Sequence, residues 1–175
     1  MKKQILIVGL LMVTTITFGQ KKEIKSAQKA IKSGDFAEAI STLKGAEGLI
    51  SSAESSVKEH YYLVKGEAYL GGAGNDYEKM NVAASAYEKV LSLDKSSKYA
   101  AEAKLGLQET TNALLISAQL DQGAKQYLEG SKKIYRGYTL SKKDTIYLYY
   151  AASLAKDGQA YDDAIKYYEE LIDVS

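Results

Sequence analysis

The feature of this sequence that most constrains its fold is a pattern of short amphipathic helices that come in pairs. In the clearest pair, apolar residues recur at helical spacing over residues 147–154 and again over residues 161–172. Asp157-Gly158, a dipeptide typical of a tight turn, separates the two segments. Such a pair predicts a helical hairpin. Because one hairpin cannot bury its own apolar face, we expect several hairpins to stack on one another.

Similar pairs of segments occur upstream. The pairs predict helical units at residues 20–53, 59–97, 111–143 and 144–175, with an extra amphipathic segment at residues 98–110. That segment either lengthens the next helix or forms a helix of its own. The chain contains no proline, so nothing in it forbids a continuous helix. We therefore expect an all-α fold.

The residues within each pair resemble the tetratricopeptide repeat, over about residues 20–175. In that family the first helix has a large residue, a small residue four positions on and an aromatic three beyond. A small residue, an aromatic and a second small residue follow in the second helix. The resemblance implies an α-α superhelix, a solenoid of about four hairpins. The best matches are Tyr62, Gly66 and Tyr69 with Ala83, Tyr87 and Val90, and Tyr147, Ala151 and Leu154 with Ala164, Tyr168 and Leu171.

Three departures from the family pattern stand out. The turn over residues 71–76 is enlarged, and Lys95 and Lys142 replace the proline that closes a unit. The last segment is not followed by a polar helix, so Tyr168, Leu171 and Ile172 are expected to expose apolar surface. We infer that the sequence is part of a longer repeat protein or that a partner covers this end.

The first residues have the pattern of a secretory signal peptide, which we place at residues 1–19. Lys2 and Lys3 precede an apolar run over residues 5–16, and Thr17 and Gly19 are the small residues before a cleavage site at Gln20. The run is shorter than the roughly 20 residues of a membrane span, which favours cleavage over a retained anchor. We therefore predict export to the periplasm or cell surface of a Gram-negative bacterium, with no stable membrane span after cleavage.

The residue after the predicted cleavage site cannot be a lipid-modified cysteine, because the chain has no cysteine. This excludes a bacterial lipoprotein. The Gln-Lys-Lys sequence at residues 20–22 resembles the start of exported Bacteroidetes proteins. Removing Lys2 and Lys3 from a formal net charge of +1 leaves −1. A near-neutral chain with a single arginine, Arg136, is not expected to bind nucleic acid.

No pattern of catalytic residues is present. Without cysteine there is no thiolate nucleophile and no cysteine metal site, and His60 is the sole histidine. The glycine-rich run at residues 71–76 lacks the Lys-Ser or Lys-Thr of a phosphate-binding loop. We predict no enzyme activity, no cofactor and no metal.

The family resemblance also implies a binding site. In tetratricopeptide proteins the first helices line a concave groove, which here is expected to bind a peptide or a helix of another protein. Some family members bind chaperone tails through a lysine and an asparagine, and Ile24 and Gln28 stand at those positions. That clamp is therefore absent. The expected groove residues are Ile24, Gln28, Lys32, His60, Leu63, Glu67, Asn112, Leu115, Gln119, Leu148, Ala152 and Lys156.

Tyrosine is in excess, with fifteen residues against two phenylalanines. Most are expected to pack in the core, Tyr150 among them, but Tyr61, Tyr149 and Tyr167 fall on another helix face and are predicted to be exposed. The sequence thus predicts a non-enzymatic scaffold for protein–protein interaction, of undetermined oligomeric state. Exposed tyrosines leave open a carbohydrate- or nutrient-binding accessory of an outer-membrane uptake system. A third possibility is the helical arm of a longer protein.

Overall fold

The structure is a computed structural model that describes residues 19–142 and 144–175. These residues form only helices and the turns between them, so the predicted all-α class is confirmed for this part of the chain. The predicted signal peptide lies outside the described residues, except for Gly19. The helices are residues 19–32, α2 Phe36–Ile50, α3 Ser55–Gly71, α4 Tyr77–Leu93, α5 Ala100–Gly123, α6 Tyr127–Ser141, α7 Ile146–Asp157 and α8 Tyr161–Asp173.

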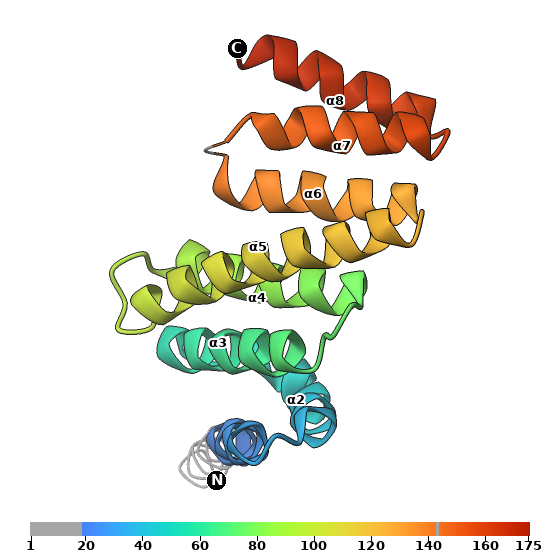
Figure 1. The fold of residues 1–175 in the computed structure, drawn as a ribbon. Coiled ribbons are helices and arrows are strands. Elements are labelled where there is room, and N and C mark those ends of the chain that lie inside the picture. Colours follow the sequence, from blue (N-terminus) through green and yellow to red (C-terminus); the bar gives the residue numbers. More distant parts are fainter. Residues whose placement is uncertain (1–18, 143) are drawn as a thin grey trace, which may run out of the picture.

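The helices stack in the order of the sequence, and each packs mainly on its neighbours in the chain. In Figure 1, α3 and α5 to α8 run across the view one above another, α4 lies behind α5, and helix 19–32 and α2 are seen nearly end-on at the base. Direct contacts that skip a helix are few, the main ones joining α3 to α5 and α4 to α6. The core is consequently a row of small apolar clusters between successive helices.

The turns inside three hairpins have the same backbone geometry. Gly34, Lys125 and Gln159 all have positive φ angles, of 80°, 60° and 61°. The residue after each donates its N–H to a carbonyl five positions back: Asp35 to Ala30, Gln126 to Asp121 and Ala160 to Ala155, at 2.8–2.9 Å. This is the Schellman arrangement that ends an α-helix. Lys125 and Gln159 lie 34 positions apart, so the last two hairpins repeat at that spacing.

The 34-residue shift corrects the predicted register of the last hairpin. Leu114 and Ala118 in α5 are both fully buried, and so are Leu148 and Ala152, which lie 34 positions later in α7. The prediction put Tyr147, Ala151 and Leu154 in the core; Ala151 and Leu154 are buried, but Leu148, one position after Tyr147, takes the place predicted for the tyrosine. Both faces of this segment are apolar, so periodicity alone could not choose between them. Burial in the structure favours the aliphatic face.

The extra segment at residues 98–110 is not a separate helix. Helix α5 is continuous for 24 residues from Ala100 to Gly123 and includes most of it. Its first turns lie against α3 and α4, where Ala103 packs in one cluster with Leu63 and Tyr87. The segment therefore lengthens the first helix of the third hairpin, and the added turns reach back over the second hairpin.

Tyr87 in α4 explains why two glycines lie where α3, α4 and α5 meet. Its ring fits against Gly66 of α3 on one side and Gly106 of α5 on the other. A Cβ atom at Gly66 would come within 2.5 Å of the ring, which is closer than real Cβ contacts. The small residue predicted at position 66 is thus a packing requirement of the aromatic predicted at position 87.

Candidate functional site

Four expected groove residues are part of the core. Leu63 is 2% exposed, and Ile24, Leu148 and Ala152 are fully buried. The prediction that they line an open groove is wrong for this structure. Leu63 is covered because Ala103, Leu107 and Tyr99 from the start of α5 pack around it. Leu148 and Ala152 were assigned through the incorrect register of the last hairpin.

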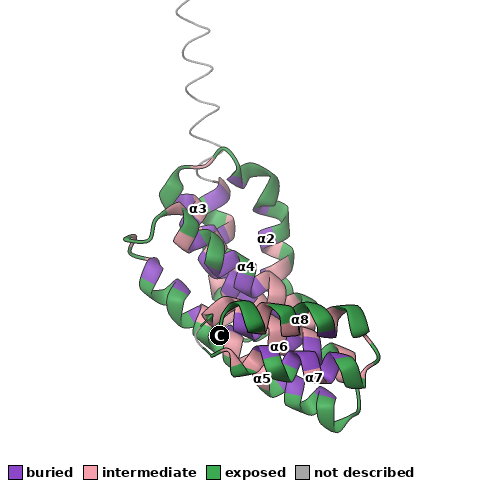
Figure 2. Cartoon of the chain, turned by 90° about the horizontal axis from the view of Figure 1, so that it is seen from above, coloured by how far each residue is buried: buried purple, intermediate pink, exposed green. Residues whose placement is uncertain are grey.

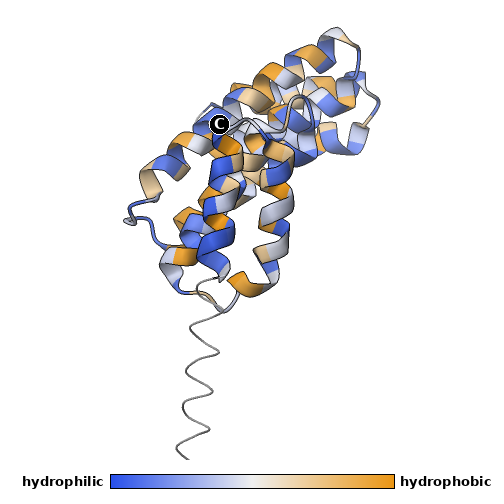
Figure 3. Cartoon of the chain, turned by 90° about the horizontal axis from the view of Figure 1, so that it is seen from below, coloured by the Kyte–Doolittle hydropathy of each residue, from blue (hydrophilic) through white to orange (hydrophobic). Residues whose placement is uncertain are grey.

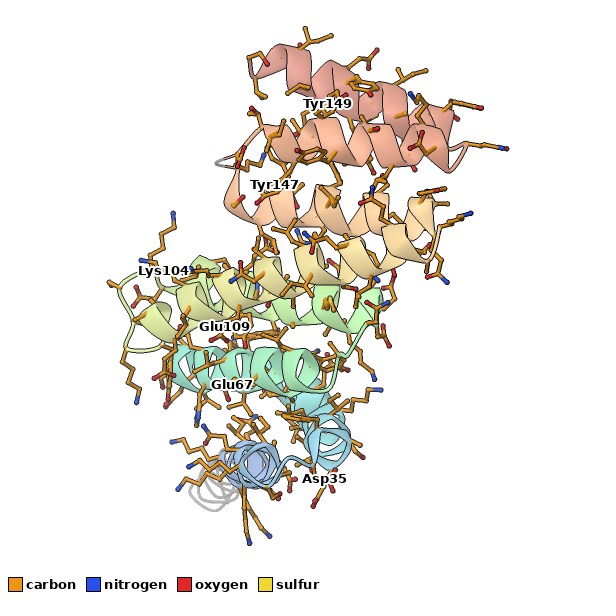
Figure 4. The ribbon with its side chains drawn as sticks, viewed as in Figure 1. Asp35, Glu67, Lys104, Glu109, Tyr147 and Tyr149 are labelled. Carbon is orange, nitrogen blue, oxygen red and sulfur yellow. The ribbon has the colours of Figure 1, made fainter. Side chains whose placement is uncertain are left out.

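The polar groove candidates of α3 are half-buried under α5. His60 stacks on Tyr99 with the ring centroids 5.1 Å apart and the planes 6° from parallel. Burial lowers the pKa of His60, and the charge of Lys98 lowers it further. Burial also raises the pKa of Glu67, and the nearby carboxylates of Glu102 and Glu109 add to the effect. Figure 4 shows Glu67 and Glu109 on α3 and α5, which lie side by side.

The remaining candidates are accessible. Lys32 and Lys156 are exposed, and Gln28 is half-buried. In α5, Asn112 and Gln119 are exposed and Leu115 is half-buried. The 34-residue shift maps these three onto Ile146, Ser153 and Tyr149 of α7, of which Ile146 and Tyr149 are 43% and 47% exposed. An accessible face therefore runs along α5 and α7.

A pocket of about 370 Å³ opens between α5, α6 and α7. Its walls are apolar and aromatic, with a few amide and carboxylate groups, which is the usual composition of a ligand pocket. Figure 4 shows Tyr147 on the side of α7 that faces α6, and Tyr149 on the opposite side, towards α8. The lining residues are Leu115, Gln119, Gln122, Ile134, Tyr147, Tyr150, Ser153, Leu154 and Asp157.

Three tyrosines were predicted to be exposed, and one of them is. Tyr149 is 47% exposed, as expected. Tyr61 is 1% exposed and its hydroxyl donates to the carbonyl of Leu43 at 3.2 Å. Tyr167 is 4% exposed and stacks on Tyr135 with ring centroids 4.1 Å apart. In contrast, Tyr150, expected in the core, is 48% exposed at the pocket.

The enlarged turn at residues 72–76 is held by a polar network that the sequence did not predict; it joins exposed Asn75 to buried side chains of α5 and α6. The Asn75 side chain donates to Asp121 Oδ1 at 3.0 Å and accepts from the Ser117 hydroxyl, and the Asn75 carbonyl accepts from Lys133 Nζ at 3.1 Å. Lys133 Nζ also pairs with Asp121 Oδ2 at 2.6 Å, with both side chains at most 3% exposed. The turn is therefore tied to α5 and α6. Lysines are so seldom fully buried that no local pattern indicates this pair.

The described residues contain no group of three or more His, Cys, Asp or Glu side chains arranged to hold a metal ion. In the same residues, no helix has the length and apolar character needed to cross a membrane. No protein-family model matches the chain, and no curated protein matches it significantly. The candidate site is thus defined by its geometry: an accessible face with one pocket.

Proposed function

We propose that this protein is an exported tetratricopeptide-type scaffold that binds a segment of another protein along the face formed by α5 and α7. The supporting observation is the pocket between α5, α6 and α7, which lies on a stack of hairpins with repeated turns. Half-buried Leu115 and exposed Tyr150 provide apolar contact area. A rigid aromatic at a pocket rim is a frequent anchor in protein interfaces.

The proposed ligand is an extended peptide or a helix with one bulky apolar side chain. That side chain fills the pocket against Tyr147, Tyr150 and Leu154. The amides of Gln119 and Gln122 are able to donate to and accept from a peptide backbone. Asp157 at the pocket edge favours a lysine or arginine next to the anchor. In this proposal the protein has no enzymatic activity.

Peptide display on the immobilised protein tests the proposal. We expect selected peptides to share an apolar anchor with a neighbouring basic residue, and to bind Tyr150→Asp at least about tenfold more weakly than wild type. Leu49→Asp is the matched control, because Leu49 is similarly exposed at 43% but lies on α2, far from the pocket in the stack. If the peptides bind Tyr150→Asp as tightly as they bind Leu49→Asp and wild type, the pocket is not their binding site.

Glycan binding at the same pocket is a second candidate, favoured by the combination of tyrosine rings with amide and carboxylate groups. Sugars stack on aromatic rings and hydrogen-bond to such polar groups. Titration with oligosaccharides, followed by tyrosine fluorescence, distinguishes the two. A saturable change that Tyr150→Ala abolishes supports the glycan, and a flat titration beside tight peptide binding rejects it.

A further inference from the structure

The outer side of α8 presents an apolar stripe at the C-terminal end of the stack. Tyr161, Ile165 and Ile172 are 60%, 56% and 75% exposed, and all three lie on one side of the helix together with half-buried Tyr168. Tyr149 of α7 continues the surface, since its ring meets that of Tyr168 at 6.2 Å. Figure 2, which views the stack from this end, shows exposed residues along α8. We call these five residues the end stripe.

The 34-residue repeat shows what covers the same surface one hairpin earlier. Shifting Ile165 and Tyr168 back by 34 positions gives Ser131 and Ile134 of α6. Ser131 is fully buried and donates to the carbonyl of Ala151 in α7 at 2.7 Å, and Ile134 packs on the α7 alanines. The α6 surface is therefore covered by an α-helix with a face of small residues. Ile165 and Tyr168 of the end stripe thus occupy the repeat positions that, one hairpin earlier, are covered by helix α7.

The charge around the end stripe indicates what kind of helix fits. Helix α8 carries five carboxylates and one lysine. The lysine, Lys166, turns towards α6, where its ammonium lies 5.2 Å from the Tyr135 ring centroid. Asp162, Glu169 and Asp173 are exposed along the solvent side of the stripe. Two copies of α8 facing one another would bring these acids together, which disfavours self-pairing through this surface.

We propose that the end stripe is a docking site for a basic amphipathic helix of a partner protein. The partner's small apolar residues pack on Ile165, Tyr168 and Ile172, as α7 packs on α6. Its lysines or arginines lie opposite Asp162, Glu169 and Asp173. From Tyr161 to Ile172 the stripe spans about 16 Å at the rise of an α-helix, so the partner helix needs roughly three turns. This site is separate from the pocket between α5 and α7 and does not depend on it.

Two designed peptides test the proposal on the full chain. Both repeat residues 144–159 with the packing residues Leu148, Ala151, Ala152 and Ala155 retained; in one the polar positions of that segment are all lysine, in the other they are all glutamate. We expect the lysine peptide to bind at least about tenfold more tightly than the glutamate peptide in fluorescence anisotropy, and more weakly as salt is raised. Equal binding of the two peptides would overturn the proposal.

Variants locate the binding surface. Ile172→Glu is expected to weaken binding of the lysine peptide at least about tenfold. Leu105→Glu, at an exposed leucine of α5, and Tyr150→Asp, in the pocket, are expected to leave it unchanged. Because Ile172 is 75% exposed, its replacement should not affect folding, which circular dichroism checks. If Leu105→Glu weakens binding as much, or if wild type forms dimers that Ile172→Glu dissociates, a helix of a partner is not the occupant.

Discussion

Helix α3, near the N-terminal end of the stack, and helix α5, nearer the C-terminal end, differ in how far their expected binding positions are open to solvent. In the N-terminal region (helix 19–32, α2 and α3), the expected binding positions Ile24 and Leu63 are buried. In the C-terminal region (α5 to α8), the expected positions Asn112 and Gln119 of α5 are open to solvent, although Leu148 and Ala152 of α7 are buried. The added turns of α5 account for much of the difference, because they lie over α3. A lengthened helix can thus convert a recognition position into a core position without any change in the residue itself.

The two regions also differ in what holds them together. In the N-terminal region the interior is mainly apolar, and its buried polar side chains are Gln20 and Glu59. Around α5 and α6 the interior includes Thr110, Ser117, Asp121, Ser131 and Lys133. Figure 3, seen from the N-terminal end, shows hydrophilic residues on helix 19–32, whose lysines face solvent. The N-terminal end therefore presents the basic helix 19–32 to solvent, whereas the C-terminal end presents the acidic helix α8 with its apolar stripe.

The largest expected change in stability comes from a substitution in the polar interior of the C-terminal region. Asp121→Ala leaves the Lys133 ammonium buried without its partner, so we expect the free energy of unfolding to fall by about 3–5 kcal/mol. Urea denaturation measures it. The double variant Asp121→Leu/Lys133→Met replaces the pair by apolar groups and is expected to recover most of the loss. A double variant no more stable than Asp121→Ala would show that the charges themselves are needed.

A matched pair of truncations tests whether the two regions treat binding positions differently. Leu63→Ala is expected to cost about 2–5 kcal/mol of unfolding free energy, because it leaves a cavity under α5. Gln119→Ala, on the open face, is expected to change stability by about 0.5 kcal/mol or less. Thermal unfolding of the two variants gives the comparison. Similar losses at both positions would mean that the α5 face is not open.

The smallest effect concerns the ionisation of Glu67 beneath α5. Its pKa is raised above the ordinary value of 4.5, so the folded state favours the protonated acid. Stability therefore falls as the pH rises through the window above 4.5. We expect Glu67→Gln to stabilise the protein at pH 7 by up to about 1 kcal/mol, and not at pH 4. Glu78→Gln, at an exposed position of α4, should show neither effect.

The sequence predicted the helices well because their signals are local. The pairing of segments, the tight turns and the small residue at Gly66 all follow from spacing within one hairpin. The register of α7 was wrong because Tyr147 and Tyr150 form an apolar stripe beside that of Leu148 and Ala152. The burial of Leu63 and the Lys133–Asp121 pair depend on residues from other helices, whose placement no local pattern specifies. Candidate sites were therefore predicted less accurately than the fold.

The order of the stack has a consequence for how the protein folds. Most contacts join helices that are consecutive in the chain, so the loops that must close during folding are short. Chains of this kind fold quickly, since few distant segments must meet before the contacts form. They also unfold from their ends, because a terminal helix has a neighbour on one side only. Helix α8, with its apolar stripe uncovered, is expected to exchange its amide hydrogens before α5 does, and a bound partner helix would slow that exchange.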